Sequence, residues 1–380
     1  MEFARYQGGT AWRCSGRSTD EILSSGVHKA IIFGETAVNP TRMLALADAD
    51  PTEDHYNRLG SLAPVVGPLG LYFCYDVEMM GPGFIFKNGL LLDGLDLIPT
   101  YVAHDVDAGR QWDLKPELGR TAVERPCIVL VSNAYRIYGH WLVDMLPKLW
   151  LCQRFLGDLS SFSIIVPRGT PAWALSIMER FFGVTNILWH EINNEVLKLS
   201  SCVVPSLLHN DHYFHPRMND FVSHLLAHPH VAAAAASARP AERLYITRRA
   251  FRDRSTSYSR TIANEEQVVD LMTEFGFTTI APEELPWEEQ IALFSRARII
   301  VGESGSGLHN TIFSPADACV VCLNPENQLQ MSIAALRDQI VINQVSPKRT
   351  VEASTSYVVD LGRLRRAVAA AIAATNPGRA

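Results

Sequence analysis

The segment RIIVGESGSGLHNTIF, residues 298–313, decides how this sequence is interpreted. Three consecutive apolar residues, Ile299, Ile300 and Val301, are typical of a buried strand, and glycine and serine then interrupt the run. A helix-like segment, 307–313, follows. A strand that passes through a glycine-rich turn into a helix is the repeating unit of parallel α/β sheets. The segment therefore predicts an α/β fold with a glycine-rich turn at the edge of its sheet.

The same alternation extends on both sides of this segment. In the second half of the chain, strands are predicted at 243–248, 278–282, 298–302 and 318–323, with helices at 264–277 and 286–297. In the first half, strands at 127–135 and 162–167 precede helices at 140–157 and 171–183. Pro147 predicts a kink or break in the first of these helices. The region before residue 125 is predicted to form short strands and loops.

The length of 380 residues favours two domains. An alanine-rich segment, 227–243, marks the clearest change in composition, and we place the boundary near residue 236. This gives domains over 1–236 and 237–345 and a tail over 346–380. The tail contains an amphipathic helix, 360–374, which we expect to pack back on the body in preference to a membrane surface.

Composition narrows the class of protein. The net charge of −6 gives no general attraction to nucleic acid, and the 47% of hydrophobic residues suffices for full cores. Neither a signal peptide nor an apolar run of about 18 residues is evident. The seven cysteines lie mostly in apolar runs, and the CVVC of 319–322 is interpreted as a buried strand rather than a redox or metal pair. We therefore expect a cytoplasmic protein with reduced thiols.

Three functions compete for the glycine-rich turn, beside a tight turn without a ligand. A nucleophile elbow would use Ser304, but the only later histidine, His309, is too close in sequence to act as its base. A dinucleotide fingerprint matches Gly305 and Gly307 but has Asn310 in place of its third glycine. A phosphate cradle needs only close-approaching backbone N–H groups and a few polar side chains. The turn supplies both.

An arginine-rich segment favours the phosphate cradle. It follows the predicted strand 243–248 and contains Arg248, Arg249, Arg252, Arg254 and Arg260. The carboxyl ends of parallel strands lie at one edge of a sheet, so these guanidinium groups and the glycine-rich turn can converge on one diphosphate.

Several motifs of this region, taken together, resemble glycosyltransferase family 61. Arg260, Asn264 and Glu265 fit its Arg-x-x-x-Asn-Glu motif. A second set fits its Glu-Gln-Ile-x-Leu-Phe helix: Glu289, Gln290, Ile291, Leu293 and Phe294. A third set fits its glycine-rich loop: Gly302, Gly305, Gly307, Leu308 and Asn310. The loop histidine of the family is Ser304 here. Upstream, YGHWLVDMLPKLW (138–150) is similar to the family's His-x-x-x-Asp-x-x-Pro segment.

The resemblance implies a GT-B fold, in which two Rossmann-like domains face each other across a cleft. It implies an inverting transferase that needs no metal, uses a nucleotide diphosphate sugar, UDP-linked, and acts in bacterial surface polysaccharide synthesis, such as capsule or lipopolysaccharide. Domain 1–236 would bind a saccharide or lipid-linked saccharide acceptor, with peripheral association at the inner membrane face. Domain 237–345 would bind the donor through Arg248, Arg249, Arg260, Asn264, Gly305, Ser306, Gly307, Leu308, His309 and Asn310.

An inverting transfer also needs a base for the acceptor hydroxyl. His140 and Asp144 are spaced i, i+4 and share a face if the segment is helical. Either Asp144 is the base, or it orients His140 as the base. The alternative without catalysis makes His140 a helix cap and Asp144 a structural hydrogen-bond acceptor.

Other constellations and functions carry less weight. His224 and His228 could bind a metal across one helical turn, and a further histidine cluster occupies 209–215, but no companion ligand motif accompanies them. Asp-x-Asp triplets at 48–50 and 105–107 resemble metal-dependent transferase motifs that arise often by chance. Two rival functions remain open: a non-catalytic subunit that binds a sugar nucleotide, and a serine hydrolase that uses Ser304.

Overall fold

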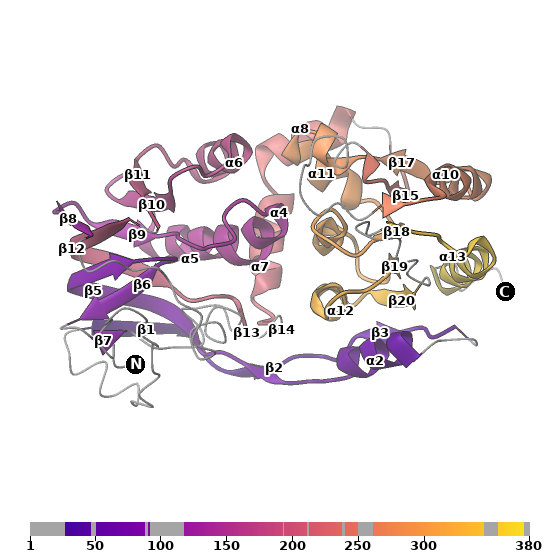
Figure 1. The fold of residues 1–380 in the computed structure, drawn as a ribbon, viewed down its shortest axis with the longest axis horizontal. Helices are drawn as coiled ribbons and strands as arrows, with labels where there is room; N and C mark the ends of the chain where they lie inside the picture. Colours follow the sequence, from indigo (N-terminus) through magenta and orange to yellow (C-terminus); the bar gives the residue numbers. More distant parts are fainter. Residues whose placement is uncertain are drawn as a thin grey trace. The chain divides into compact units, whose positions relative to one another are not determined.

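A computed structural model describes residues 27–46, 51–87, 90–91, 118–192, 194–210, 213–237, 240–249, 261–345 and 356–375. The chain divides into two compact units (Figure 1). The first comprises Met1–Thr36 and Val65–Asp211, and the second comprises Ala37–Pro64 and His212–Ala380. The division near residue 211 comes before the predicted boundary at 236, because α7 (Met218–Leu226) and α8 (Pro229–Ser237) pack with helices of the second unit.

The first unit is built on a nine-stranded mixed sheet. Its parallel part contains β8 (Gly119–Val123), β9 (Cys127–Val129), β10 (Ser163–Pro167), β11 (Ile187–His190) and β12 (Glu195–Pro205). Its antiparallel part contains β1 (Val27–Phe33), β5 (Leu69–Met80), β6 (Phe84–Lys87) and β7 (Leu90–Leu91). The long strand β12 joins the two parts because it pairs parallel with β9 and antiparallel with β5. The sheet is therefore not the all-parallel sheet of a simple Rossmann-like domain.

One helix of the first unit is irregular at the predicted catalytic residues. It begins as α4 (Tyr138–His140), widens into a π-helical turn over Trp141–Met145, and continues as α5 (Leu146–Leu156). Pro147 explains the widening, because it cannot donate to the carbonyl of Val143 and its ring crowds that carbonyl. The N–H of Leu146 bonds instead to the carbonyl of Trp141. The helix thus does not break at Pro147. Next to it, α6 (Ala172–Phe182) ends at Gly183, as predicted.

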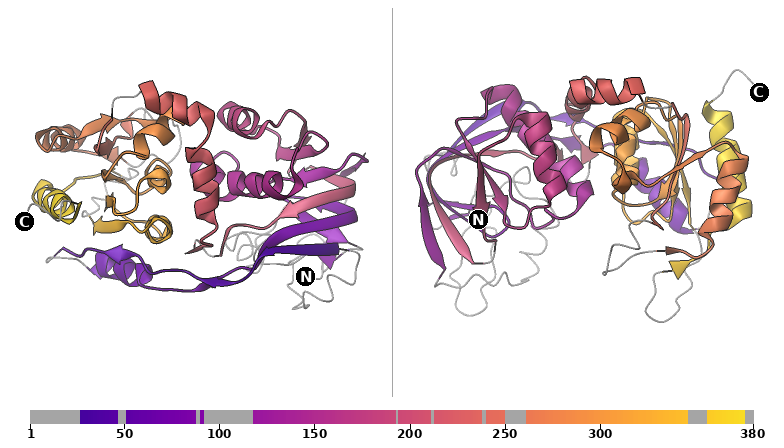
Figure 2. Two further views of the ribbon diagram at one scale, coloured as in Figure 1. Left: turned by 180° about the vertical axis from the view of Figure 1, so that it is seen from behind. Right: turned by 90° about the horizontal axis from the view of Figure 1, so that it is seen from above.

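The second unit contains a six-stranded parallel sheet in the order β17-β15-β18-β19-β20-β3. Its strands are β15 (Arg243–Ile246), β17 (Thr278–Ile280), β18 (Ile299–Glu303), β19 (Cys319–Leu323), β20 (Ile340–Gln344) and β3 (Arg42–Met43). Helices α10 (Glu265–Glu274) and α13 (Leu361–Thr375) cover one face, and α11 (Trp287–Phe294) and α12 (Leu329–Arg337) cover the other (Figures 1 and 2). This is a doubly wound α/β architecture, as the alternating pattern predicted.

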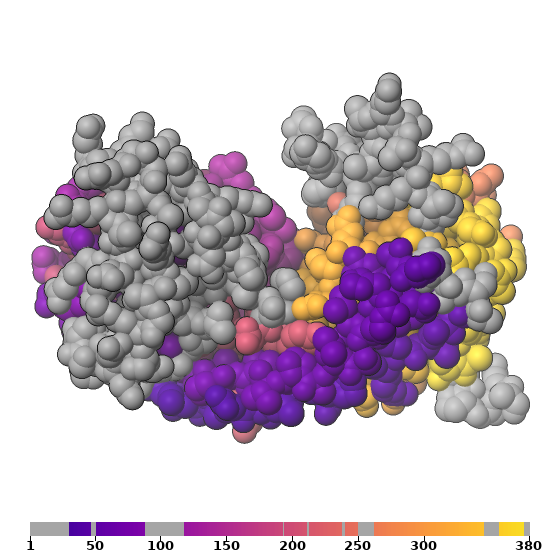
Figure 3. Space-filling model, turned by 60° about the horizontal axis from the view of Figure 1, so that its bottom comes forward, coloured from indigo at the N-terminus to yellow at the C-terminus, as the bar shows by residue number. Residues whose placement is uncertain are grey.

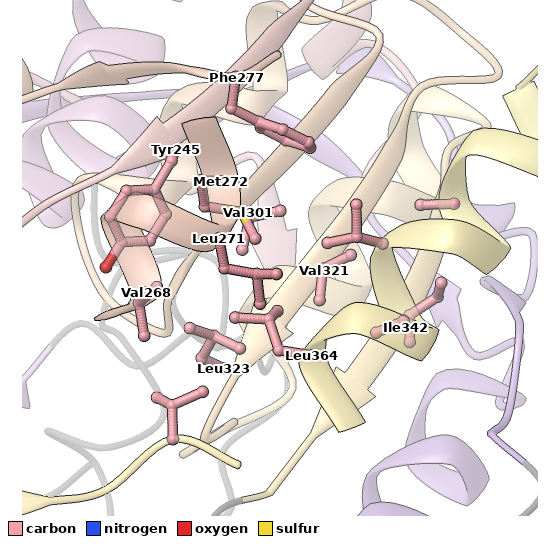
Figure 4. Close-up of a cluster of buried hydrophobic side chains, with 14 of the residues drawn as sticks. Tyr245, Val268, Leu271, Met272, Phe277, Val301, Val321, Leu323, Ile342 and Leu364 are labelled. Atoms are coloured by element: carbon pink, nitrogen blue, oxygen red, sulfur yellow. The ribbon is translucent and has the colours of Figure 1, made fainter. Parts of the chain in front are cut away.

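The core of the second unit lies between its sheet and the pair α10 and α13 (Figure 4). Tyr245, Val301 and Val321 project from the strands, and Leu271 and Leu364 meet them from the helices. The segment predicted as a helix after the glycine-rich turn is a 3₁₀-helix, Leu308–Phe313. The CVVC segment lies in the buried strand β19, which confirms its interpretation as a strand.

Two segments distant in sequence complete the second unit. The helix α2 (Pro51–Gly60) and β3 lie against its strands and helices, and Figure 3 shows this indigo and violet segment on the orange and yellow surface. The tail helix α13 buries Leu364, Ala367, Val368 and Ala371. In the part of the chain that the structure describes, no helix has both the length and the apolarity to cross a bilayer.

Candidate active site

The first unit contains a buried carboxylate between two histidines. Nδ1 of His140 lies 2.7 Å from Oδ2 of Asp144, and Nε2 of His209 lies 2.7 Å from Oδ1 of the same carboxylate. Asp144 is buried, and so is His209, whereas the side chain of His140 is 26% exposed. Each carboxylate oxygen therefore receives one imidazole, and only His140 of the three reaches the surface to a substantial extent.

The irregular helix positions the first two residues. His140 ends α4, and Asp144 lies in the π-helical turn one helical turn later, so both side chains point to the same side. Such π-helical turns are often found at functional sites, because they re-aim side chains within a continuous helix. Ile137 occupies the N-cap position, so His140 is not the helix cap.

His209 comes from β13 (His209–Asn210), which follows β12 closely. Sequence reasoning missed its part in this group and weighed it only within a histidine cluster considered for metal binding. The two residues are 65 positions apart, and nothing in the local pattern relates them. The position of His209 just after a buried strand was the one available signal, since such positions lie at a sheet edge.

The electrostatics of the group follow from its burial and its hydrogen bonds. Burial by itself would raise the pKa of the Asp144 carboxyl, but the hydrogen bonds and charges of His140 and His209 outweigh it and hold that pKa well below its usual range. Burial likewise opposes the protonated form of His140, and Asp144 outweighs it, so the pKa of His140 lies above the ordinary histidine value. The carboxylate is thus ionised, and His140 is the more basic of the two candidate groups.

This arrangement suits general base chemistry. An ionised carboxylate bonded to Nδ1 fixes the imidazole tautomer, because Nδ1 must carry the proton, and Nε2 becomes the basic nitrogen. The carboxylate also stabilises the imidazolium that forms after proton transfer. Asp144, buried and already accepting two hydrogen bonds, is poorly placed to take a proton from a substrate itself.

In the second unit, Arg248 and Arg249, the described part of the arginine-rich segment, lie at the same edge of the sheet as the glycine-rich turn. Strands β15 and β18 are parallel neighbours, with Ile246 opposite Gly302. Arg248 therefore follows one strand where the turn follows the other, and its Nη1 lies 3.1 Å from Oε2 of the buried Glu303. These two arginines and the turn share one edge of the sheet, as the parallel order predicted.

The second arginine is tied to the helix that follows. Nε of Arg249 lies 3.4 Å from Oε2 of Glu265 in the first turn of α10, and its backbone N–H donates to the hydroxyl of Thr247 at 3.2 Å. The Thr247 hydroxyl in turn donates to Glu265. Both arginines are therefore held by acidic side chains of this edge. Arg252, Arg254 and Arg260 lie outside the described residues.

The glycines of the turn differ in whether the local structure explains a glycine at that position. A Cβ on Gly302 would lie 3.1 Å from Cβ of Ile246, so the close packing of the strands favours glycine there. Gly305 has φ of 147°, which favours glycine. Gly307 has φ of −65°, and a Cβ there would meet ordinary contacts only, the nearest at 3.6 Å. Neither local space nor backbone conformation therefore requires glycine at 307.

Of the remaining residues predicted to bind the sugar donor, some lie at the surface and others are buried. Ser306 is partly exposed, and Leu308, His309 and Asn310 are buried. Nδ2 of Asn310 donates to Gln290 at 3.0 Å, which anchors the 3₁₀-helix to α11. Asn264 exchanges two hydrogen bonds of 2.9 Å with the backbone of Val359, so its amide joins α10 to the segment before α13.

The geometry does not support a nucleophile elbow at Ser304. Ser304 is buried, and its N–H donates to the carbonyl of Leu323 at 2.9 Å, whereas a nucleophile elbow exposes its serine. Among the described residues, no group of three histidine, cysteine, aspartate or glutamate side chains is arranged to hold a metal. The Asp-x-Asp triplets lie outside the described residues.

Comparison with known families gives a match to the central part of the chain. The glycosyltransferase 61 model matches residues 138–321, just under half of the chain. The match begins in α4 and ends in β19, so it contains the His140–Asp144–His209 group, Arg248 and Arg249, and the glycine-rich turn. No curated protein gave a match. The chain is therefore a glycosyltransferase, an enzyme that works with a sugar donor and an acceptor. Residues 138–321 form its glycosyltransferase family 61 domain.

Proposed function

We propose that the chain is an inverting glycosyltransferase that uses His140 as its general base. The observation that carries the proposal is the hydrogen bond between Nδ1 of His140 and the buried Asp144, inside the matched domain. The donor is a nucleotide diphosphate sugar, UDP-linked, and the acceptor is a saccharide or lipid-linked saccharide. The proposal includes the GT-B arrangement, metal-independent transfer and a cytoplasmic role in bacterial surface polysaccharide synthesis that the resemblance implies.

The proposed step balances without a further reactant. Nε2 of His140 takes the proton of the acceptor hydroxyl, and the oxygen attacks the anomeric carbon from the face opposite the diphosphate. The new carbon–oxygen bond forms as the bond to the diphosphate oxygen breaks, and the electron pair leaves with the nucleotide diphosphate. Inversion follows from this single displacement. Asp144 stabilises the imidazolium that results.

The edge of the second sheet supports donor binding. Arg249 is the clearer phosphate ligand, because its side chain is 40% exposed and a guanidinium has five N–H donors, of which a carboxylate uses at most two. Gly307 supports the same assignment, since glycine occupies a position where a side chain would fit and a ligand backbone contact would explain it. Arg248 holds Glu303 and so orders the loop beside them.

The test combines binding and turnover. A thermal-shift panel of nucleotides and nucleotide sugars should show stabilisation by UDP or one UDP-sugar, reduced in Arg249→Ala. Donor hydrolysis or transfer should then be lost in His140→Ala and fall by about 10²-fold or more in Asp144→Asn. Stabilisation by UDP without any turnover of a donor by the unaltered protein would favour the non-catalytic subunit. Indifference to every nucleotide would end the proposal.

A further inference from the structure

We propose that His209 is a positioning residue, which holds the Asp144 carboxylate so that one oxygen is presented to His140. The inference rests on the proposed role of His140 as the base. His209 approaches Asp144 from a different element, β13, and bonds to Oδ1, whereas His140 of the same helix bonds to Oδ2. The carboxylate is therefore clamped at both oxygens.

The two histidines differ in solvent exposure, and this difference distinguishes their roles. The side chain of His209 is 5% exposed and that of His140 is 26% exposed. A substrate hydroxyl can reach a partly exposed imidazole, but it cannot reach a buried one. Although both rings lie 2.7 Å from Asp144, only His140 can act on the substrate. His209 can act only through Asp144.

The hydrogen bonds also fix two opposite tautomers. Because the carboxylate only accepts, the nitrogen facing it must carry a proton in each ring. His140 therefore keeps its proton on Nδ1, and His209 keeps its proton on Nε2. This makes Nε2 of His140 the basic atom, as the transfer requires. A donor at Oδ1 prevents the carboxylate from rotating away from His140.

His209 also changes how strongly the Asp144 carboxylate attracts the proton of His140. An N–H at Oδ1 stabilises the anion and weakens its pull on the proton of His140. Without that N–H, the carboxylate attracts the protonated form of His140 more strongly. Lys148, four residues after Asp144, is the other buried charged residue of this helix. It is present both with and without His209, so it does not account for a difference in the pKa of His140 between the variants. Loss of His209 should therefore raise the pKa of His140.

The experiment compares His209→Leu with His209→Gln. The glutamine amide nitrogen can occupy the place of Nε2 and donate to Oδ1, but it cannot be protonated, whereas leucine fills the space without a donor. We expect His209→Leu to lower kcat more than about tenfold with the donor KM little changed, and His209→Gln to stay within about threefold of the unaltered enzyme. The acidic limb of the kcat/KM profile should move up by about half a unit to one unit in the leucine variant only.

A second readout separates this inference from the proposed function. Histidine NMR titration measures the pKa of His140 without any turnover, with the signal assigned by its loss in His140→Gln. A higher pKa in His209→Leu than in His209→Gln supports the positioning role even if no sugar donor is turned over. An unchanged pKa in both variants, or equal losses of kcat in both, overturns it. If the leucine variant does not fold, His209→Asn, whose shorter amide does not reach Oδ1, replaces it with the same expectations.

Discussion

The guanidinium of Arg363 lies 2.8 Å from the carboxylate of Glu53, although 310 residues separate them in the chain. Glu53 is 1% exposed and also accepts the backbone N–H of Val345 at 2.6 Å. This pair joins the early helix α2 to the tail helix α13 within the second unit. An arginine of the tail, for which a membrane surface was the alternative partner, thus has an internal one.

Removing this arginine should destabilise the second unit. In Arg363→Met, the buried carboxylate of Glu53 loses its cation, and we expect a loss of about 3 kcal/mol in the free energy of unfolding. Urea unfolding followed by fluorescence measures the change. The matched control on the same helix is Arg365→Met, whose pair with Glu274 is exposed on both sides and should contribute less than about 1 kcal/mol. Equal effects of the two substitutions would contradict the role of Glu53 as the internal partner.

The His140–Asp144 pair predicts the pH dependence of the enzyme. Because Asp144 raises the pKa of His140, the base is neutral only above that raised value, and activity should fall as the pH drops through it. In Asp144→Asn the charge is gone, so the pKa of His140 falls and the acidic limb of kcat/KM should move to lower pH. The plateau should also drop by about 10²-fold or more, because the amide can donate to Nδ1 and select the wrong tautomer.

The control for this profile is Asp144→Glu, which keeps the charge but displaces the carboxylate. It should keep the acidic limb closer to that of the unaltered enzyme than Asp144→Asn does. A limb that stays in place in Asp144→Asn would show that His140 is not the group that titrates.

Substitutions at Asn264 test whether this residue stabilises the fold or binds the sugar donor. Asn264→Ala removes both hydrogen bonds to Val359, and we expect about 1–3 kcal/mol of destabilisation. In Asn264→Asp, one carboxylate oxygen still accepts the N–H of Val359, but the other takes the place of the donor and faces the carbonyl oxygen of Val359. Two acceptors repel each other, so the loss of stability should be at least as large as in Asn264→Ala. If stability is unchanged in both while the nucleotide thermal shift disappears, Asn264 binds the donor and its contact with Val359 is incidental.

The part of the second unit from Arg243 to Leu323 was predictable because its elements follow local rules, whereas α12 and β20 were not predicted. The alternating pattern from Arg243 to Leu323 gives strands and helices of ordinary length, and parallel pairing places the loops after β15 and β18 at one edge. The addition of β3 to this sheet was not predictable, since Arg42 and Met43 pair with a strand almost 300 residues away and no local pattern indicates the pairing.

The candidate active site was predictable only in part. Spacing alone brought His140 and Asp144 together, because a helix relates residues four apart whether its turn is α or π in part. The π-helical turn itself needed the knowledge that the chain stays helical through Pro147, which depends on burial of the helix. His209 could not be found, because its meeting with Asp144 depends on the return of the chain along β12.

The two glycines at the ends of the glycine-rich turn give a prediction that tests ligand approach directly. In Gly302→Ala, the new Cβ meets the side chains of Ile246 at 3.1 Å and Leu308 at 3.2 Å, so these side chains must move by a few tenths of an ångström, and we expect a loss of about 1–3 kcal/mol in stability. In Gly307→Ala, the backbone already has a helical φ and ψ, and the Cβ meets nothing closer than 3.6 Å. Stability should therefore stay within about 0.5 kcal/mol of the unaltered protein.

If a diphosphate approaches the backbone at residue 307, the same small methyl group should weaken nucleotide binding. We expect at least a tenfold rise in the Kd for UDP or the preferred UDP-sugar in Gly307→Ala, measured by isothermal titration calorimetry, with no change in the unfolding midpoint of the unliganded protein. Gly276→Ala provides a control for glycine substitution in this unit away from the turn, since Gly276 follows α10 with φ of 73° and should lower stability without affecting the affinity of the folded protein. Undiminished binding in Gly307→Ala would place the diphosphate elsewhere on this unit.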